Sequence, residues 1–268
     1  MKELFKQRIA ILGAGNIGRM LLERLRRSGM TVRMAVYDKD PQKAEQAAAQ
    51  VGADVVSEGE VGNCGAQLWL LCMGPKAVLP FLKQLSPCLQ PGHIVVSFAA
   101  AVSLERLEML VPEGVHMVRV MPNMPSQVGE GMNPVCFNEK VPPEAEEIVL
   151  QLLEILGETV KVSDEQMNWC VGLSGAAMRS LIPVIEGMIR AGQDAGLSTK
   201  KARKIAAQVM LGTAALVSEM DEMSLAEIKT LTPMETVDEE QVAGMFEEAA
   251  ANAKGKIDRL QATILNEN

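Results

Sequence analysis

Three closely spaced glycines near the start of the chain have the spacing of a phosphate-binding turn. Gly13, Gly15 and Gly18 form the pattern GxGxxG directly after the apolar run 8–12 and ahead of an amphipathic segment. In that setting the first glycine permits a tight turn, the second lets the backbone approach a diphosphate, and the third allows close packing of helix against strand. The anion then lies over the helix N-terminus. The segment therefore predicts a dinucleotide-binding turn, with a plain strand–helix turn as the alternative.

A carboxylate stands at the end of the second β-like run. Asp38 follows the first glycine by about 25 positions, where a carboxylate accepts hydrogen bonds from the ribose hydroxyls of NAD(H) and repels the 2′-phosphate of NADP(H). Lys39 and Arg33 are the nearest cations and would weaken that repulsion. We interpret Asp38 as favouring NADH over NADPH; the alternative is that it only caps the following turn.

Two further strand exits carry a Gly-Pro turn or small residues. Residues 68–71 have the pattern of a buried strand that ends in CMGP, and Ser97 is followed by FAA. Ligands of open α/β sheets bind beside the carboxyl ends of the strands. We therefore expect both exits to contact the cofactor, with tightly packed turns as the alternative; they comprise Cys72, Met73, Gly74, Pro75, Phe98, Ala99 and Ala100.

The hydropathy pattern predicts the elements that position these residues. Several of the expected strands are continuous apolar runs, which is typical of a parallel sheet covered on both faces. Strands are expected at 8–12, 31–37, 67–72, 93–97, 115–120, 134–138 and 159–162, and helices at 16–28, 41–51, 76–85, 104–110 and 143–156. This alternation predicts a Rossmann-type, doubly wound α/β sheet.

After Ser163 the strand signals stop. Helices are expected at 164–195, from an N-cap at Ser198 to about 220, from Ser224 to Thr232-Pro233, and from Asp238 towards 260. The chain is thus predicted to form a dinucleotide-binding domain at 1–162, followed by an all-helical domain at 163–268.

Composition excludes several other classes. The chain has 268 residues with 26 Lys and Arg against 34 Asp and Glu, a net charge of −8, which disfavours nucleic-acid binding. No apolar stretch is long enough for a membrane span, and the glycines within residues 1–29 break any signal-peptide pattern. Five cysteines without CxxC spacing predict reduced, buried thiols in a cytoplasmic protein, and two histidines offer little for a metal site or a Ser-His-Asp triad, so no metal is expected.

The most distinctive segment is RVMPNMP at 119–125. Two prolines flank Asn123 at a strand exit, so the backbone is stiff and the amide side chain is held in one direction. Together with the glycine pattern, SFAAAVSLERL at 97–107 and VGLSG at 171–175, it resembles the pyrroline-5-carboxylate reductase family, in order and spacing along nearly the whole chain.

The resemblance implies a Rossmann domain and a helical domain that interlocks with that of a partner, giving a homodimer or a higher homo-oligomer. It implies reduction of the C=N bond of a small cyclic imino acid, 1-pyrroline-5-carboxylate, to L-proline with NADH or NADPH. By match to the family's motifs, the pyrophosphate would be held by Gly13, Gly15, Asn16, Ile17 and Gly18, and the nicotinamide end by the exits 72–75 and 98–100 and by Asn123. Ser174 and Gly175 would begin the substrate helix, and Thr232, Pro233 and Thr236 would bind the substrate carboxylate.

The sequence departs from the family pattern at three places. The usual V-K-P is Met73-Gly74-Pro75, SGSGPAY is SGAAMRS at 174–180, and SPGGTT is TPMETV at 232–237, which brings Glu235 close to the expected substrate anion. Cofactor binding is therefore better preserved than substrate recognition. The alternatives are a nucleotide-binding protein without proline-forming activity, with a regulatory or interaction role, and a reductase of a different imino acid.

Arg179 offers a compensating charge. It lies four residues after Gly175 and would hold a substrate carboxylate in a bidentate manner, or else pair with Glu186 or with a carboxylate of the dimer partner. An iminium carbon is already electrophilic, so hydride transfer requires positioning more than a general acid. No lysine occurs between Asp164 and Leu197, which disfavours alcohol oxidation, because that reaction needs a base.

Overall fold

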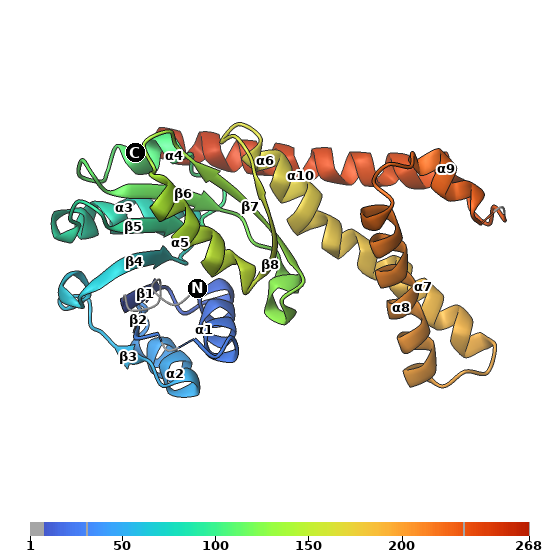
Figure 1. The fold of residues 1–268 in the computed structure, drawn as a ribbon, viewed down its shortest axis with the longest axis horizontal. Helices are drawn as coiled ribbons and strands as arrows, with labels where there is room; N and C mark the ends of the chain where they lie inside the picture. Colours follow the sequence, from blue (N-terminus) through green and yellow to red (C-terminus); the bar gives the residue numbers. More distant parts are fainter. Residues whose placement is uncertain (1–7, 31, 233, 268) are drawn as a thin grey trace. The chain divides into compact units, whose positions relative to one another are not determined.

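The computed structural model describes residues 8–30, 32–232 and 234–267. Within these residues the N-terminal half forms one eight-stranded sheet in the order β3-β2-β1-β4-β5-β6-β7-β8 (Figure 1). Neighbouring strands are parallel except at the antiparallel pair β6–β7. The strands are β1 Arg8–Leu12, β2 Met34–Tyr37, β3 Asp54–Val55, β4 Ala66–Leu71, β5 Ile94–Ser97, β6 His116–Val120, β7 Gly131–Phe137 and β8 Gly157–Lys161. The predicted doubly wound sheet is confirmed.

Helices cover both faces of this sheet, and strand alternation divides the apolar residues between two cores. Ile9 and Ile11 of β1 contribute to the core beneath α1 Asn16–Arg27, α2 Pro41–Val51 and α5 Pro143–Glu154. Ala10 and Leu12 contribute to the opposite core, beneath α3 Pro75–Leu85 and α4 Leu104–Glu108. Because both faces are buried, the strands are apolar throughout, as the sequence pattern predicted.

The C-terminal part of the chain is helical. It comprises α6 Met167–Cys170, a π-helical segment Val171–Ala176, α7 Ala177–Asp194, α8 Thr199–Glu219, α9 Leu225–Thr230 and α10 Glu239–Glu267. Ser198 caps α8 by accepting a hydrogen bond from the Lys201 N–H, and Ser224 forms a capping box with Glu227 at the start of α9.

The chain divides into two compact units. The first comprises residues 1–175 and 252–268, so it includes the C-terminal end of α10; the second comprises residues 176–251. Within the first unit, Ile264 of α10 is buried in the same core as Leu104 of α4, and the two helices lie side by side (Figure 1). The domain boundary predicted from the sequence, between 162 and 163, stays a prediction.

Several predicted elements need correction. β2 begins at Met34 rather than at 31, and Thr31 lies outside the described residues. The helix expected at 164–195 is interrupted by the π-helical segment, where the Ser174 hydroxyl donates to the Cys170 carbonyl, a bond that competes with regular helix pairing. The last helix, α10, continues past 260 to Glu267. The sequence did not predict β3, because it consists of two exposed residues without any hydropathy pattern.

Candidate dinucleotide-binding site

The glycine turn after β1 has three glycines with three different environments. Gly13 has φ +109°, and a Cβ there would lie 3.0 Å from the Cys72 carbonyl carbon. A Cβ on Gly18 would lie 1.9 Å from the Gly13 carbonyl oxygen, which is impossible without movement of the backbone. A Cβ on Gly15 would meet nothing within 4 Å. The first and third glycines therefore allow the turn to pack, while the second leaves open space in front of the helix.

The start of α1 provides hydrogen-bond donors at that open space. Gly15 is the N-cap residue, and the first intrahelical bond runs from the Arg19 N–H to its carbonyl. The N–H groups of Asn16, Ile17 and Gly18 consequently have no acceptor within the helix, and the helix dipole favours an anion beside them. Open space in front of Gly15 together with free donors fits a diphosphate.

Asp38 binds the glycine turn directly. Its Oδ2 accepts a hydrogen bond from the Ala14 N–H at 2.7 Å, and its Oδ1 accepts one from the Asp40 N–H at 2.9 Å. The second bond is the turn-capping contact that the sequence left open as an alternative. Each carboxylate oxygen retains a lone pair, and the side chain is half-buried at the edge of a pocket, so the predicted ribose contact stays a prediction.

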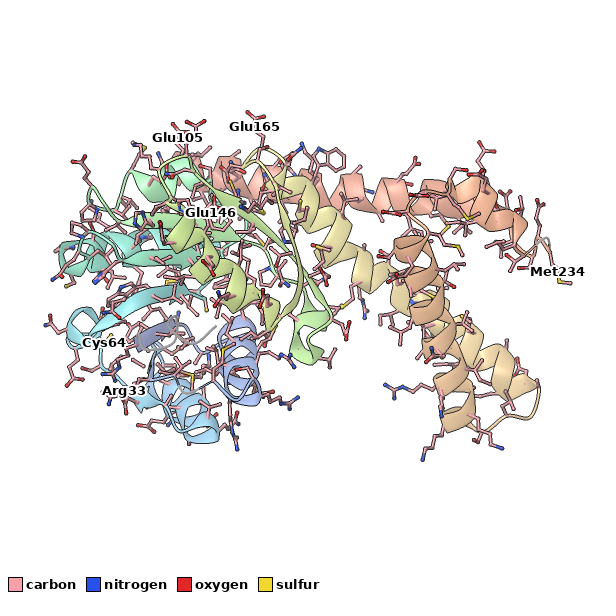
Figure 2. All side chains as sticks on the ribbon, in the orientation of Figure 1. Arg33, Cys64, Glu105, Glu146, Glu165 and Met234 are labelled. Carbon is pink, nitrogen blue, oxygen red and sulfur yellow. The ribbon has the colours of Figure 1, made fainter. Side chains whose placement is uncertain are left out.

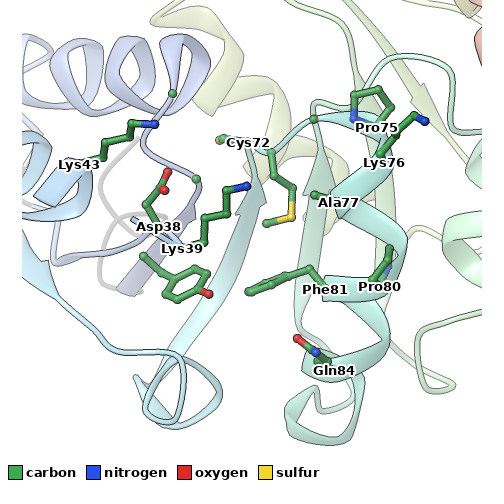
Figure 3. A pocket seen from close by; sticks show the side chains of 15 residues that line it. Asp38, Lys39, Lys43, Cys72, Pro75, Lys76, Ala77, Pro80, Phe81 and Gln84 are labelled. Carbon is green, nitrogen blue, oxygen red and sulfur yellow. The ribbon is translucent and has the colours of Figure 1, made fainter. Parts of the chain in front are cut away.

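A pocket of about 700 Å³ opens between the carboxyl ends of β1, β2 and β4 and the helix α3 (Figure 3). Asp38, Lys39 and Lys43 lie on one side and Cys72 and the α3 residues on the other. The Tyr37 and Phe81 rings stack with centroids 5.3 Å apart. Pocket residues are Gly13, Gly15, Tyr37, Asp38, Lys39, Lys43, Cys72, Met73, Gly74, Pro75, Lys76, Ala77, Pro80, Phe81 and Gln84. The lining includes three lysines and one carboxylate, so its formal charge is positive and favours an anion.

The structure brings together most of the residues predicted to hold the cofactor. Seven of them line the pocket: Gly13, Gly15, Asp38, Cys72, Met73, Gly74 and Pro75. Asn16, Ile17 and Gly18 form the first turn of α1 behind Gly15, whereas Ala99, Ala100 and Asn123 belong to other strand exits. Burial raises the pKa of the Cys72 thiol far above its usual range, so this pocket side chain stays uncharged. Burial, followed by the charges of Glu58 and Asp38, also raises the pKa of Tyr37.

One face of α3 was missed by the sequence analysis. Ala77, Phe81 and Gln84 line the pocket together with Pro80. Their spacing of three to four residues places them on one side of a helix. Since the preceding Gly-Pro turn was already predicted to contact the cofactor, this spacing is the signal that would have found them.

The exit of β5 has an unusual backbone. The Phe98 N–H donates to the Leu71 carbonyl, and the Ala99 N–H lies 3.3 Å from the Ser97 hydroxyl. Ala101 then has φ +60° although it is not a glycine, and it is buried. A left-handed alanine is strained, and strain of this kind is concentrated at functional sites. It directly follows Ala99 and Ala100, which are expected to contact the nicotinamide end.

Asn123, at the exit of β6, is held at both ends of its side chain. Its Oδ1 accepts a hydrogen bond from the Met132 N–H at 3.0 Å, and its Nδ2 lies 3.4 Å from the Ser174 carbonyl. The Ser174 hydroxyl is buried and donates to the Cys170 carbonyl at 2.7 Å. The structure thus brings together two of the predicted catalytic residues, Asn123 and Ser174, at the π-helical segment.

The other predicted catalytic residues lie in the second unit. Arg179 is exposed on α7; Glu186 pairs with Arg190 at 3.5 Å, and Arg179 forms no ion pair among the described residues. Thr232 follows α9, and Thr236 lies in the exposed loop before α10. Pro233 falls outside the described residues, while the side chain of Met234 beside it is 82% exposed (Figure 2). The roles of Arg179, Thr232 and Thr236 stay predictions.

Two family models match different parts of the chain. Residues 8–101 match the one described as "NADP oxidoreductase coenzyme F420-dependent", and residues 164–260 match "Pyrroline-5-carboxylate reductase dimerisation". The fold and the site therefore define a Rossmann-type, nucleotide-binding oxidoreductase class of protein, followed by a helical domain of the dimerisation type.

Individual relatives agree with this class. The chain is 31% identical over 224 residues to a pyrroline-5-carboxylate reductase of Haemophilus influenzae, with 82% of each chain covered. It is 29% identical over 219 residues to the pyrroline-5-carboxylate reductase of Escherichia coli, with 81% of each covered. The fold matches the solved pyrroline-5-carboxylate reductase of Coxiella burnetii with a TM-score of 0.81 at 22% identity, covering 95% of this chain and 98% of that one. The pyrroline carboxylate reductase of Plasmodium falciparum with NADP bound also gives a TM-score of 0.81, at 18% identity, covering 96% and 99%.

This chain belongs to the pyrroline-5-carboxylate reductase family. The resemblance predicted from the sequence is confirmed, and so is the predicted order of a Rossmann-type sheet followed by a helical part.

Proposed function

We propose that this chain reduces the C=N bond of 1-pyrroline-5-carboxylate to give L-proline, with a nicotinamide dinucleotide as the reductant. The observation that carries this function is the similarity to pyrroline-5-carboxylate reductases, because it spans both the nucleotide-binding part and the helical part of the chain. The glycine turn, with its open space and free N–H groups, supports the cofactor.

The residues present fit such a cofactor, and each has a role to play in holding it. Gly15 and the first turn of α1 would hold the diphosphate, Asp38 the adenine-side ribose, and the exits at 72–75 and 98–100 the nicotinamide end. When bound, the dihydronicotinamide supplies the hydride that adds to the imine carbon. The chain's own contribution is alignment: the Asn123 carboxamide, fixed by Met132 and Ser174, provides a rigid polar contact at the reacting end.

We further propose that NADH is preferred over NADPH. The contact from the Ala14 N–H fixes the Asp38 carboxylate at the pocket edge, where its remaining lone pairs suit the two ribose hydroxyls and its charge opposes a 2′-phosphate. Lys39 and Lys43 reduce this discrimination without abolishing it, since both lysines are exposed and screened by solvent.

The second unit supports assembly as a homodimer or a higher homo-oligomer. Its α7 and α8 expose apolar side chains, among them Ile182, Val184, Ile205 and Val209, each more than 40% exposed. Only Ala202 and Ala206 of α8 are buried, so burial within one chain contributes little to the stability of these two helices. A second copy would cover these faces. Sedimentation of the wild type should show a dimer or larger species, and Val209→Asp should shift it towards monomer; a monomeric wild type would refute the assembly.

The cysteines support a cytoplasmic location. All five are free thiols, with Cys64 and Cys136 buried and the other three half-buried. Within the described residues, no helix combines the length and the apolar character needed to cross a lipid bilayer. Fractionation of cells that express a fluorescent fusion, followed together with marker proteins of each compartment, would check the location.

The reductase activity is tested by following oxidation of NADH and NADPH with a panel of cyclic imines and by identifying the product chromatographically. Gly15→Val should abolish turnover by filling the space before α1, where a Cβ meets no atom within 4 Å. Gly59→Val, at an exposed turn where a Cβ also meets no atom, is the matched control. Nucleotide binding without turnover of any imine would refute the reductase and favour a nucleotide-binding role. Turnover of another imine alone would reassign the substrate.

A further inference from the structure

A buried arginine connects the sheet to the segment that follows β8. Arg119 of β6 is 1% exposed, and its Nη1 donates to Asp164 Oδ1 at 2.7 Å. The second carboxylate oxygen of Asp164 accepts a hydrogen bond from the Leu104 N–H at the start of α4. The charge of the buried guanidinium is therefore compensated by a carboxylate that is itself held by a second hydrogen bond.

The network continues through Asn168 to the C-terminal helix. Asn168 Oδ1 accepts from Arg119 Nη2 at 3.2 Å, while its Nδ2 donates to Asp258 Oδ1 at 3.0 Å and to Gln261 Oε1 at 2.6 Å. Asp258 also accepts a hydrogen bond from Lys254, whose ammonium lies 5.5 Å from the centre of the Trp169 ring. Asn168 thus uses both ends of its amide, and α10 is bound to the buried arginine through one side chain.

The same helical segment is held a second time at the exit of the strand that carries Arg119. Asn123, four residues further along the chain, contacts the Ser174 carbonyl. Residues 167–176 are therefore tethered at Asn168 by Arg119 and at Ser174 by Asn123. The chain enters the second unit at the last residue of this segment, at 175/176, and returns from it at 251/252, shortly before Asp258.

We propose that Asn168 and Asp258 are positioning residues: acting through Arg119, they hold residues 167–176 against the exit of β6 and so fix the Asn123 carboxamide for the reaction. Neither residue lines the nucleotide pocket. The hydrogen bonds at both Nη atoms of Arg119 and at both ends of the Asn168 amide fix the arrangement of their partners, and Arg119 Nε is the atom of this guanidinium that has no partner among the described residues. This inference rests on the proposed function, which places Asn123 at the reacting end.

The test uses the full chain and removes the outermost member of the network. Asp258 is half-buried on a helix surface, so Asp258→Ala should fold. We expect kcat for the imine to fall on the order of tenfold, because small misplacements of an aligning group have effects of this size, while the Kd for NADH changes less than about twofold. Amide hydrogen exchange in residues 167–176 should become faster. Glu248→Ala removes an exposed carboxylate from the same helix and should leave all three measurements unchanged.

A swap of side chains tests the coupling itself. Asn168→Asp places a second carboxylate beside Asp258 and should lower kcat at least as much as Asp258→Ala. Adding Asp258→Asn restores a donor opposite an acceptor and gives the double variant the same net charge as the wild type. Its kcat should be higher, and its amide exchange in residues 167–176 slower, than in either single variant. A purely structural role would lower thermal stability without this recovery.

The outcomes separate this inference from the proposed function. Unchanged kcat and unchanged exchange in Asp258→Ala would overturn the positioning role, and so would an equal loss of imine turnover and NADH affinity. A wild-type chain that turns over no imine would refute the proposed function instead. In that case the exchange of residues 167–176 would still decide whether the network holds the segment.

Discussion

Replacing Asp38 with alanine removes two backbone contacts and two further acceptor positions at once. Each charge-assisted hydrogen bond to a ribose hydroxyl contributes roughly 1.5–3 kcal/mol, and allowing for imperfect additivity the pair contributes about 3 kcal/mol to NADH binding. Loss of the acceptor for the Ala14 N–H costs about 1 kcal/mol for either nucleotide. Removing the charge relieves repulsion of a 2′-phosphate by about 1 kcal/mol in a solvent-exposed site. The Kd for NADH should therefore rise at least roughly 100-fold, and that for NADPH, whose ribose keeps only the 3′-hydroxyl, roughly tenfold.

Fluorescence titration with both nucleotides measures this difference directly. Asp40→Ala is the matched control, because Asp40 lies in the same loop and caps α2 through the Gln42 N–H at 3.2 Å. It should cost about 1 kcal/mol of stability and affect both nucleotides alike. If Asp38→Ala weakened NADH and NADPH by the same factor, Asp38 would serve only to hold the glycine turn, and the proposed preference for NADH would be wrong.

Two other substitutions test separate parts of the site. Gly18→Ala should lower the free energy of unfolding by about 1–2 kcal/mol in urea denaturation, because the clash with the Gly13 carbonyl outweighs the helix-propensity gain of alanine. Gly15→Ala, whose Cβ meets no atom within 4 Å, should not lower it. Equal stability of the two variants would contradict the packing argument. Arg179→Met should raise the KM of an acidic imine several-fold and leave the Kd of NADH unchanged, and an unaltered KM would assign Arg179 to structure.

The sheet was predictable because local patterns determine it. The apolar run 8–12 and the glycines after it identify β1 and α1 with almost no error. Ser198 was expected to cap a helix, and α8 indeed begins at the next residue, Thr199. Elements without a local signal were missed: β3 is two exposed residues, and the last turns of α10 are recognisable only because Ile264 packs into a core formed by distant residues.

The candidate site was predictable to the same degree and for the same reason. The glycine turn and Asp38 lie at strand exits, where sequence order alone brings side chains to one edge of the sheet. The Arg119 network could not be found in this way, since Asp164 and Asn168 follow Arg119 by 45 and 49 residues and Asp258 follows Asn168 by 90. Nothing in the local sequence of Asn168 indicates that its amide bridges two of them.

The candidate cofactor residues and the candidate substrate residues differ in how firmly the backbone determines them. The proposed cofactor contacts depend on the backbone of the glycine turn, which Gly13, Gly18 and Asp38 fix by sterics and hydrogen bonds. The candidates for binding the substrate carboxylate are exposed side chains of the second unit, where Glu235 adds a negative charge and Val237 provides no hydroxyl. Substitutions in the second unit should therefore change the KM of the imine and its selectivity without changing nucleotide affinity. Under the proposed function, this separation would allow a chain of this family to keep its cofactor site while its substrate loop changes.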